Sequence, residues 1–215
     1  MANRSTEGEG LARPPDYSKP DHYTRKAHDR GYAARSVFKL EEVDEKEGLL
    51  RPGMRVLDLG SAPGSWMQYA AEKVGPKGLV VGVDLNPLER QLRPNERFLQ
   101  GDAFALGPEA FPAPTFDLVL SDLMPHTIGH KASDHYRSVA MAERALELAD
   151  ALLRPGGDFL VKVFQGADFE AFRARLRERF RAVKIKKPKC SRPNSRELYL
   201  LGLDKKRKEE NHGQG

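Results

Sequence analysis

The sequence predicts an α/β protein built on a doubly wound, mostly parallel sheet. Short apolar stretches of strand length alternate with stretches of helical periodicity between residues 34 and 203. A glycine-rich turn links the first of these strands to a helix, and an aspartate follows several of the strands. Strands that alternate with helices form parallel sheets, and such sheets bind ligands beyond the carboxyl ends of their strands.

The first half of the chain supplies three of the expected strands. Residues 34–47 carry Val37, Leu40 and Val43 at helical spacing, and Pro52-Gly53 predicts a turn. We expect strands at 55–59, 78–83 and 97–100, and a helix at 68–74 after the glycine-rich turn.

The second half of the chain continues the alternation. Residues 116–121 form an apolar run typical of a strand buried on both faces. A long helix is expected at 134–153 and ends before the turn sequence 154–157; a strand follows at 158–164 and an amphipathic helix at 168–180. The short connection between the last strands, 183–187 and 198–203, predicts an antiparallel pair, so an antiparallel edge strand joins the sheet.

Length and composition fit one folded domain with polar ends. The chain has 215 residues, and 39% of them are hydrophobic, which is enough to bury a core. We expect a flexible arm at 1–21, a single domain at 22–203 and a disordered tail at 204–215, because both ends are polar and rich in charge.

Membrane and secretory classes are disfavoured by the same composition. The longest apolar runs fall well short of the ~20 residues that a membrane-spanning helix needs. The first residues contain no apolar stretch typical of a signal peptide. A single cysteine, Cys190, excludes an intrachain disulfide and a cysteine-cluster zinc site. We therefore expect a cytoplasmic protein with no membrane partner.

The turn after the first strand predicts a ligand-binding loop. It reads Asp58-Leu-Gly60-Ser-Ala-Pro-Gly64-Ser-Trp66, so two glycines allow a tight turn and a close approach of backbone to ligand. The G-x-G-x-x-G spacing of a dinucleotide site is missing. An ordinary tight turn explains the glycines equally well. Trp66 packs either near the ligand or in the core.

Acids at the ends of the next strands support a nucleoside site. Asp84 lies about 20 residues beyond the turn, where a carboxylate accepts both hydrogen bonds of a ribose diol. Asp102 is placed to accept from an adenine amino group, and Asp122 follows the fourth strand. Each acid alone is explained by turn or capping chemistry. Together they outline a nucleoside pocket without a phosphate grip, which suits S-adenosylmethionine better than a dinucleotide.

Three further charged residues stand in apolar surroundings. Lys162 interrupts the fifth strand, where an ammonium is unfavourable to bury unless it is paired. Lys39 and Glu197 also lie between apolar neighbours. A surface position explains each of them singly.

The four residues Lys39, Asp122, Lys162 and Glu197, together with the Asp58–Trp66 motif, resemble the FtsJ/RlmE family of ribose 2′-O-methyltransferases. The similarity runs over 22–203. The mild departures are Ser61 and Ser65, where the family often has alanine and glycine.

This resemblance implies a class I methyltransferase fold with S-adenosylmethionine as the methyl donor. It implies that the four charged residues are catalytic, and that the cofactor contacts are Gly60, Gly64, Trp66, Asp84, Asp102 and Asp122. Lys162 is then the candidate base for the 2′-hydroxyl proton. Burial and the like charge of Lys39 favour its neutral form, whereas Asp122 and Glu197 favour its charged form.

The substrate implied by the resemblance is RNA, most specifically a uridine of 23S ribosomal RNA in the assembled large subunit. The alternatives are a transfer RNA ribose methyltransferase, a methyltransferase for small molecules or proteins, and a non-enzymatic RNA-binding assembly factor of the same fold. We expect a monomer.

Two basic clusters agree with an RNA partner. The net charge is only +5, but residues 181–196 hold seven Lys and Arg and no acid. We expect RNA contacts from both clusters, at Arg25, Lys26, Arg30, Arg35, Lys186, Lys187, Lys189 and Arg192. A solvated surface explains either cluster alone. Tyr136 is a candidate for stacking on a base.

Three histidines, His126, His130 and His135, raise the question of a metal site. No cysteine or clear carboxylate accompanies them, so we expect RNA-contacting or exposed histidines and no metal.

Overall fold

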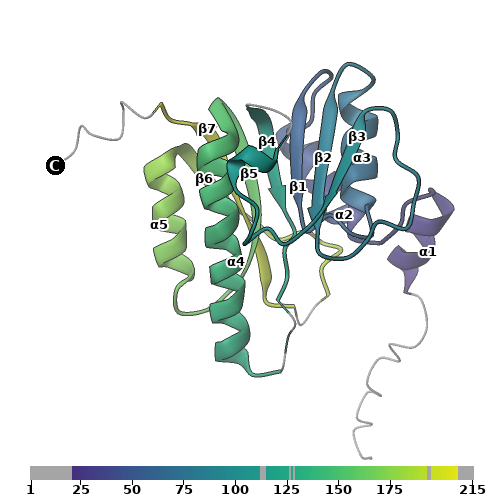
Figure 1. The fold of residues 1–215 in the computed structure, drawn as a ribbon. Helices are drawn as coiled ribbons and strands as arrows, with labels where there is room; N and C mark the ends of the chain where they lie inside the picture. Colours follow the sequence, from purple (N-terminus) through teal and green to yellow (C-terminus); the bar gives the residue numbers. More distant parts are fainter. Residues whose placement is uncertain (1–20, 112–114, 126, 128, 193–194, 208–215) are drawn as a thin grey trace, which may run out of the picture.

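The computed structural model describes residues 21–111, 115–125, 127, 129–192 and 195–207, and they form one sheet covered by helices on both faces (Figure 1). The seven strands have the order β3-β2-β1-β4-β5-β7-β6. They are β1 (Arg55–Leu59), β2 (Leu79–Asp84), β3 (Glu96–Gln100), β4 (Phe116–Ser121), β5 (Leu153–Phe164), β6 (Phe180–Lys186) and β7 (Glu197–Lys205). Strands β1 to β5 pair in parallel, and β7 is antiparallel to both β5 and β6. The predicted fold class is confirmed.

The helices form two layers, one on each face of the sheet. Figure 1 shows α4 (Lys131–Leu152) and α5 (Phe169–Arg179) together on one face, with α2 (Val37–Glu47) and α3 (Ser65–Val74) on the other. The short helix α1 (His22–Asp29) packs beside α2, and one 3-10 turn, η1 (Pro108–Ala110), precedes β4.

Side-chain alternation in the strands divides the core between the two layers. Leu57 of β1 belongs to the apolar cluster that includes Ala145 of α4. Its neighbour Val56 belongs to the cluster that includes Met67 of α3. Both faces of the central strands are therefore buried, which explains why these strands read as continuous apolar runs.

Helix α1 was not expected, because His22–Asp29 is short and holds only two apolar residues, Tyr23 and Ala27. A side-chain cap at its N-terminus and two apolar contacts hold this helix in place. The Asp21 carboxylate caps it by accepting from the Thr24 backbone N–H at 2.8 Å. Ala27 is fully buried, and the Tyr23 ring lies 5.7 Å from that of Phe38.

Several expected boundaries differ from the structure by a few residues, and two of them are informative. The sequence 154–157 was expected to separate a helix from a strand, but β5 already begins at Leu153, opposite Phe116, and the register of the β4–β5 ladder shifts before Leu118. An irregularity within a ladder accommodates the proline and glycines there. Asp204 and Lys205 were placed in the tail but are the last residues of β7. Residues 208–215 of the expected tail and residues 1–20 of the expected arm lie outside the described residues.

The strand order reverses between β1 and β4, and the loops that follow these strands meet. The Asp122 N–H donates to the Leu59 carbonyl at 3.0 Å. Gly60 has φ +79°, and a Cβ there would lie 2.9 Å from the Leu123 backbone nitrogen. The glycine is thus required by the backbone conformation and by the close approach of the two loops. This reversal is the place where doubly wound sheets bind ligands.

Candidate active site

Four charged residues from different parts of the chain meet at the carboxyl edge of the sheet. Lys39 Nζ lies 2.7 Å from Glu197 Oε1, and Lys162 Nζ lies 3.0 Å from Asp122 Oδ1. All four line one cavity of about 390 Å³. The juxtaposition expected from the resemblance is therefore present in the structure.

Pairing of neighbouring strands brings Lys162 and Asp122 together. Ser121 at the end of β4 lies opposite Val161 of β5, so the next residue of each strand reaches the same edge. The Lys162 amine also donates to the Asp122 carbonyl at 2.6 Å. Only 3% of the Lys162 side chain is exposed, so this ammonium is buried and paired.

Lys39 reaches the site because the first residues before α2 are fastened to α3. The Trp66 indole N–H donates to the Ser36 carbonyl at 2.8 Å. The Ser36 and Ser65 hydroxyls lie 2.9 Å apart. These contacts fix the start of α2 and the direction of its axis, and hence the position of Lys39 in its first turn.

Tyr199 is a member of the site that sequence reasoning missed. Its hydroxyl donates to Asp122 Oδ1 at 2.7 Å, and its ring lies 5.8 Å from the Trp66 ring and 6.0 Å from Lys39 Nζ. The available signal was strand periodicity, because Tyr199 is two residues from Glu197 and shares its face of β7.

The environment keeps Asp122 ionised. Burial alone raises the pKa of this carboxyl, but the charges of Lys162 and Lys39 and the hydrogen bond from Tyr199 outweigh it, so the pKa lies below its usual value. The carboxylate is then a fixed negative charge between two amines.

The remaining walls of the cavity are basic, hydroxyl-bearing and apolar. They are Arg35, Ser36, Met124, Phe164, Arg192 and Ser195. Arg35 is held in place by an ion pair with Asp21 and a hydrogen bond to the Cys190 carbonyl. Met124 is 57% exposed at the rim, so the cavity opens to solvent beside a flexible apolar side chain.

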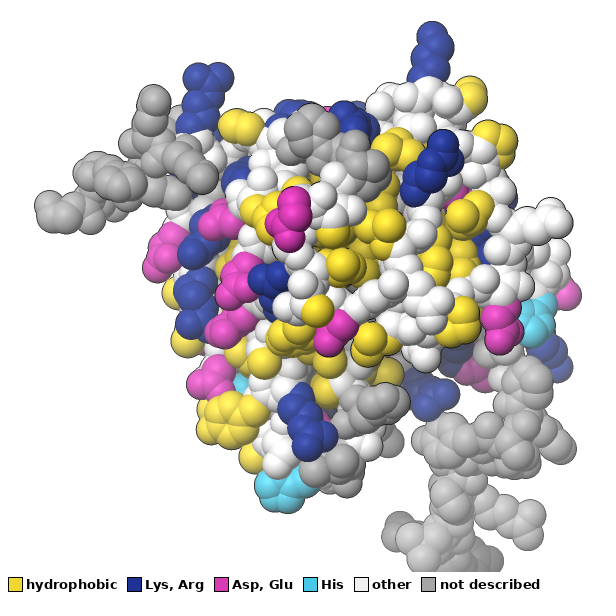
Figure 2. All heavy atoms as spheres, viewed as in Figure 1, with side chains coloured by type: hydrophobic (Ala, Val, Ile, Leu, Met, Phe, Trp, Pro, Cys, Tyr) yellow, Lys and Arg dark blue, Asp and Glu magenta, His cyan; other side chains and the backbone are white. Residues whose placement is uncertain are grey.

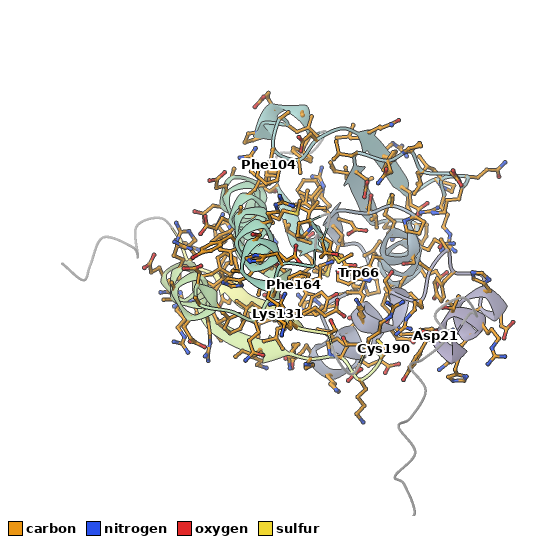
Figure 3. The ribbon with its side chains drawn as sticks, turned by 90° about the horizontal axis from the view of Figure 1, so that it is seen from below. Asp21, Trp66, Phe104, Lys131, Phe164 and Cys190 are labelled. Carbon is orange, nitrogen blue, oxygen red and sulfur yellow. The ribbon has the colours of Figure 1, made fainter. Side chains whose placement is uncertain are left out.

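The glycine-rich turn lies beside this cavity, at the start of α3. Gly64 has φ +104°, a conformation that favours glycine, and α3 begins at the next residue. The first N–H groups of a helix have no partner within the helix. Figure 3 looks onto this edge of the molecule from below, with Trp66 and Phe164 labelled near its centre.

Asp84 and Asp102 stand where the sequence predicted, and each already makes turn hydrogen bonds. Asp84 accepts from the Ala62 N–H at 2.9 Å and from the Asn86 N–H at 2.8 Å. Asp102 accepts from the Phe104 N–H at 2.9 Å. The alternative reading, turn chemistry, therefore describes contacts that do exist. It does not exclude a ligand, because a carboxylate accepts several hydrogen bonds.

Asp58 is the unexpected acid of this region. It lies at the end of β1 under the glycine-rich turn and is fully buried, and neither of its carboxyl oxygens has a hydrogen-bond partner in the described structure. Burial, together with the negative charges of Asp122 and Asp84, raises the pKa of Asp58 well above its usual value. A buried polar group without a partner is uncommon and calls for a donor supplied from elsewhere.

Of the two readings for the Trp66 side chain, the structure shows the core position. Only 3% of the residue is exposed, and it belongs to the apolar cluster between the sheet and helices α2 and α3. Its N–H is used by Ser36. Any contact of Trp66 with a ligand at the turn would involve its backbone.

The basic residues divide into cavity, exposed and paired positions. Arg35 and Arg192 line the cavity. Arg25 and Lys26 are exposed on α1, and Lys187 and Lys189 are on the connection from β6 to β7.

Two of the expected RNA-contacting residues outside the cavity form ion pairs within the protein. Arg30 makes a two-pronged pair with Glu41, at 2.9 and 2.6 Å. Lys186 forms an ion pair with the largely buried Glu47, which also pairs with Lys184 at 2.6 Å. One carboxylate on α2 therefore faces two lysines of β6, and the expected RNA contact of Lys186 stays a prediction.

The histidines have other roles than metal binding. His130 Nδ1 accepts from the Ser133 N–H at the start of α4, and the buried His135 has both ring nitrogens in hydrogen bonds. His126 lies outside the described residues. Among the residues that the structure describes, no three His, Cys, Asp or Glu side chains are grouped as metal ligands. Within the same residues, no helix is long and apolar enough to cross a membrane.

The fold and the site together define an α/β protein with a charged cavity at the switch point of a doubly wound sheet, which is where proteins of this architecture bind ligands. The model of the FtsJ-like methyltransferase family matches residues 32–205, and the chain belongs to that family.

The most similar relatives and solved structures agree. A ribosomal RNA large subunit methyltransferase E from Desulfatibacillum aliphaticivorans is 49% identical over 86% of this chain and 91% of its own length. Its namesake from Syntrophobacter fumaroxidans is 47% identical over 87% and 96%. A Plasmodium falciparum structure assigned as a ribosomal RNA methyltransferase has 27% identity and a TM-score of 0.72, covering 81% of this chain and 98% of that one.

Proposed function

We propose that this enzyme transfers a methyl group from S-adenosylmethionine to a ribose 2′-hydroxyl in RNA, at a uridine of 23S ribosomal RNA in the assembled large subunit. The observation that carries the proposal is the buried pair of Lys162 and Asp122 in one cavity with Lys39 and Glu197. The relatives named above as large-subunit ribosomal RNA methyltransferases support this substrate.

The residues at the glycine-rich turn fit S-adenosylmethionine. Asp84 and Asp102 supply carboxylates for the ribose diol and the adenine amino group, next to the exposed apolar side chains Leu85 and Phe104. Gly60, Gly64 and the backbone at Trp66 form the turn against which the rest of the ligand lies. Asp58 lacks the donor that an ammonium group would provide, so we assign the amino-acid end of the cofactor to it.

Lys162 has the role of base. The bound cofactor supplies a methyl group made electrophilic by its sulfonium charge. Lys162 Nζ, held by the Asp122 carbonyl and carboxylate, takes the proton from the 2′-hydroxyl, and this requires a neutral amine at that moment. Lys39, held by Glu197, adds a positive charge next to the developing alkoxide. Positioning of the reactants contributes up to about 7–11 kcal/mol in favourable systems.

The RNA interface in this proposal surrounds the cavity. Arg35 and Arg192 in the cavity wall contact phosphates of the target strand, and exposed Arg25 and Lys26 on α1 extend the contact. Lys187 and Lys189 extend it on the other side. Arg30 and Lys186 are paired with Glu41 and Glu47, so they contribute less net positive charge to this interface.

The flank of the molecule over α5 has a different electrostatic character. At the left of Figure 2, over α5, blue and magenta side chains alternate. Arg179 pairs with Asp150 at 3.0 Å, and Arg173 with Glu170 at 3.2 Å. Alternating charges leave little net attraction for a polyanion, so the RNA approaches the carboxyl edge of the sheet instead.

We further propose that the protein acts in the cytoplasm as a monomer. Every residue that the catalytic scheme needs comes from this one chain and lines one cavity.

A labelling experiment tests the proposal. The protein is incubated with methyl-labelled S-adenosylmethionine and, separately, large subunits, free ribosomal RNA and transfer RNA, and the label is mapped to a ribose or a base. We expect ribose label in the large subunit. Label in transfer RNA alone, on a small molecule or protein, or on a base contradicts the proposal, and binding without transfer indicates an assembly factor.

A further inference from the structure

Strand β5 extends past the end of β4, and the extension carries two residues of the cavity wall. The last β5 residue paired with β4 is Val161, whereas β5 continues to Phe164. Lys162 and Phe164, on this extension, both line the cavity. Strand β7 pairs with the extension on its other side, up to Phe164 opposite Glu197. On the side of the extension that faces away from β7, the backbone N–H and C=O groups therefore need another hydrogen-bond partner.

Helix α4 supplies that partner through two buried side chains. The Phe164 N–H donates to Ser138 Oγ at 2.9 Å, and the Phe164 carbonyl lies 3.0 Å from His135 Nδ1. Ser138 and His135 are 2% and 3% exposed. Both backbone polar groups of Phe164, two residues from Lys162, are thus bonded to one helix.

The hydrogen bonds fix which nitrogen of His135 carries the proton. The Asp168 backbone N–H, which can only donate, points at His135 Nε2 at 3.0 Å. Nε2 is therefore the acceptor, and the proton is on Nδ1, from which it is donated to the Phe164 carbonyl.

The imidazole also fills the space under the loop that follows β5. A Cβ at Gly166 would lie 2.5 Å from the His135 ring. The loop therefore packs directly on the ring, between its bond to Phe164 and its bond to Asp168. A buried histidine in this position connects the end of β5 to the start of α5.

We propose that His135 is a positioning residue for methyl transfer: its bond to the Phe164 carbonyl holds the end of β5 so that Lys162 stays against Asp122. This proposal rests on the proposed function. Lys162 has to meet a ribose oxygen and a methyl carbon at the same time, and a displacement of about 1 Å in such an arrangement lowers the rate up to about 100-fold.

Two substitutions separate the two hydrogen bonds of His135. In His135→Asn the amide nitrogen occupies the place of Nδ1 and still donates to Phe164. In His135→Gln the amide reaches the place of Nε2 and still accepts from Asp168, but the donor to Phe164 is lost. We expect His135→Asn to keep most of the wild-type kcat and His135→Gln to lose about 10- to 100-fold, with KM for the RNA substrate little changed in both.

A matched control comes from the same helix. Val139 is buried on α4 and has no polar side-chain atom. Val139→Ala is expected to lower the thermal midpoint without lowering kcat. Thermal unfolding and S-adenosylmethionine binding are measured for all three variants, so that a misfolded protein is recognised. Equal kcat for His135→Asn and His135→Gln, or losses that only follow the loss of stability, would overturn the proposal.

Crystal structures of the two variants decide the matter independently of turnover. We expect Lys162 Nζ to stay within hydrogen-bond distance of the Asp122 carbonyl in His135→Asn and to leave it in His135→Gln. A Lys162 that stays in place in both contradicts the positioning role. If the wild-type protein labels no ribose, the proposed function fails, while these structures still test whether His135 positions Lys162.

Discussion

At the residue scale, the centre of the site is one carboxylate with several donors. The Asp122 carboxylate accepts a hydrogen bond from the Tyr199 hydroxyl and forms an ion pair with Lys162. The Lys162 amine also donates to the Asp122 backbone carbonyl. A buried ion pair that is broken on one side leaves an uncompensated charge. Each of these groups therefore contributes to the stability of the site as well as to its chemistry.

Replacement of Lys162 distinguishes a base from a fixed charge. Arginine stays protonated and cannot accept the 2′-hydroxyl proton. If Lys162 is the base, Lys162→Arg and Lys162→Met both lose about 10²- to 10⁴-fold in kcat, measured by label transfer under saturating substrate. If Lys162 only stabilises the alkoxide by its charge, Lys162→Arg keeps a substantial part of the wild-type kcat. Lys46→Met, at an exposed pair with Glu42, is the control and is expected to be neutral.

The pH dependence of the stability of Asp58→Asn tests whether the unpartnered Asp58 carboxyl has a raised pKa in the folded protein. Because the folded pKa is raised, the wild-type protein loses stability as pH rises above the unfolded pKa, by up to about 1.4 kcal/mol per pH unit until the folded pKa is reached. The amide does not ionise, so the variant escapes this loss. Urea unfolding at pH 4 and pH 8 is expected to show the variant gaining on wild type at the higher pH.

Asp58→Asn is expected to weaken cofactor binding, although it stabilises the folded protein relative to wild type at high pH. If Asp58 holds the amino group of S-adenosylmethionine, the amide weakens cofactor binding, as measured by calorimetry at pH 8. Unchanged affinity would remove Asp58 from the cofactor site while leaving the stability prediction intact.

At the element scale, the turn between β1 and α3 is built against the loop after β4. Gly60→Ala meets two penalties, the positive φ and the Leu123 backbone, whereas Gly48→Ala meets only the first, because no atom lies within 4 Å of a Cβ there. An alanine at positive φ costs about 1–2 kcal/mol. We expect Gly60→Ala to destabilise more than Gly48→Ala in urea unfolding, and only Gly60→Ala to lose cofactor affinity.

Two neighbouring lysines at the end of β6 are expected to contribute differently to RNA binding. Lys186 is paired with Glu47, whereas Lys187 Nζ donates to the backbone carbonyl of Ser195 at 3.2 Å. Lys187→Ala is expected to reduce the slope of log affinity against log salt by about 0.7–0.9. Lys186→Ala is expected to change the slope less and the stability more. Equal slopes for both variants contradict the interface.

At the scale of the whole molecule, the two helix layers leave the carboxyl edge of the sheet as the binding edge. The residues proposed to hold the cofactor come from the ends of β1, β2 and β3 and the loops after them, and the charged cluster comes from α2, the loop after β4, β5 and β7. Ligand binding at this edge therefore couples both halves of the sheet.

Cofactor binding is expected to stabilise the entire domain. A ligand that binds only the folded state at 100 times its Kd adds about 2.7 kcal/mol. S-adenosylmethionine should therefore raise the urea midpoint of the wild-type protein, whereas Asp84→Ala should abolish most of this shift. A midpoint that does not respond in the wild type contradicts the assigned cofactor.

The amino-acid pattern was sufficient for the mostly parallel sheet with its antiparallel edge, because apolar runs, glycine-rich turns and terminal acids are local signals. The set of four charged residues was expected only from the family resemblance, since a surface position explains Lys39, Lys162 and Glu197 singly. The pattern was insufficient for α1, which is short and is held by one cap and two apolar contacts. It was also insufficient for the start of β5, because strand pairing overrides a proline–glycine turn signal.

Contacts between distant segments were decided only by the tertiary structure. The roles of Tyr199 and His135 depend on bonds to Asp122 and Phe164, 77 and 29 residues away, and the pairing of Lys186 depends on Glu47, 139 residues away. The unpartnered state of Asp58 likewise follows from what surrounds it in space. Local sequence determines which residue types follow which strand. Packing of the helices on the sheet determines which of those side chains meet, since hydrogen bonds and charges act over a few ångströms regardless of separation along the chain.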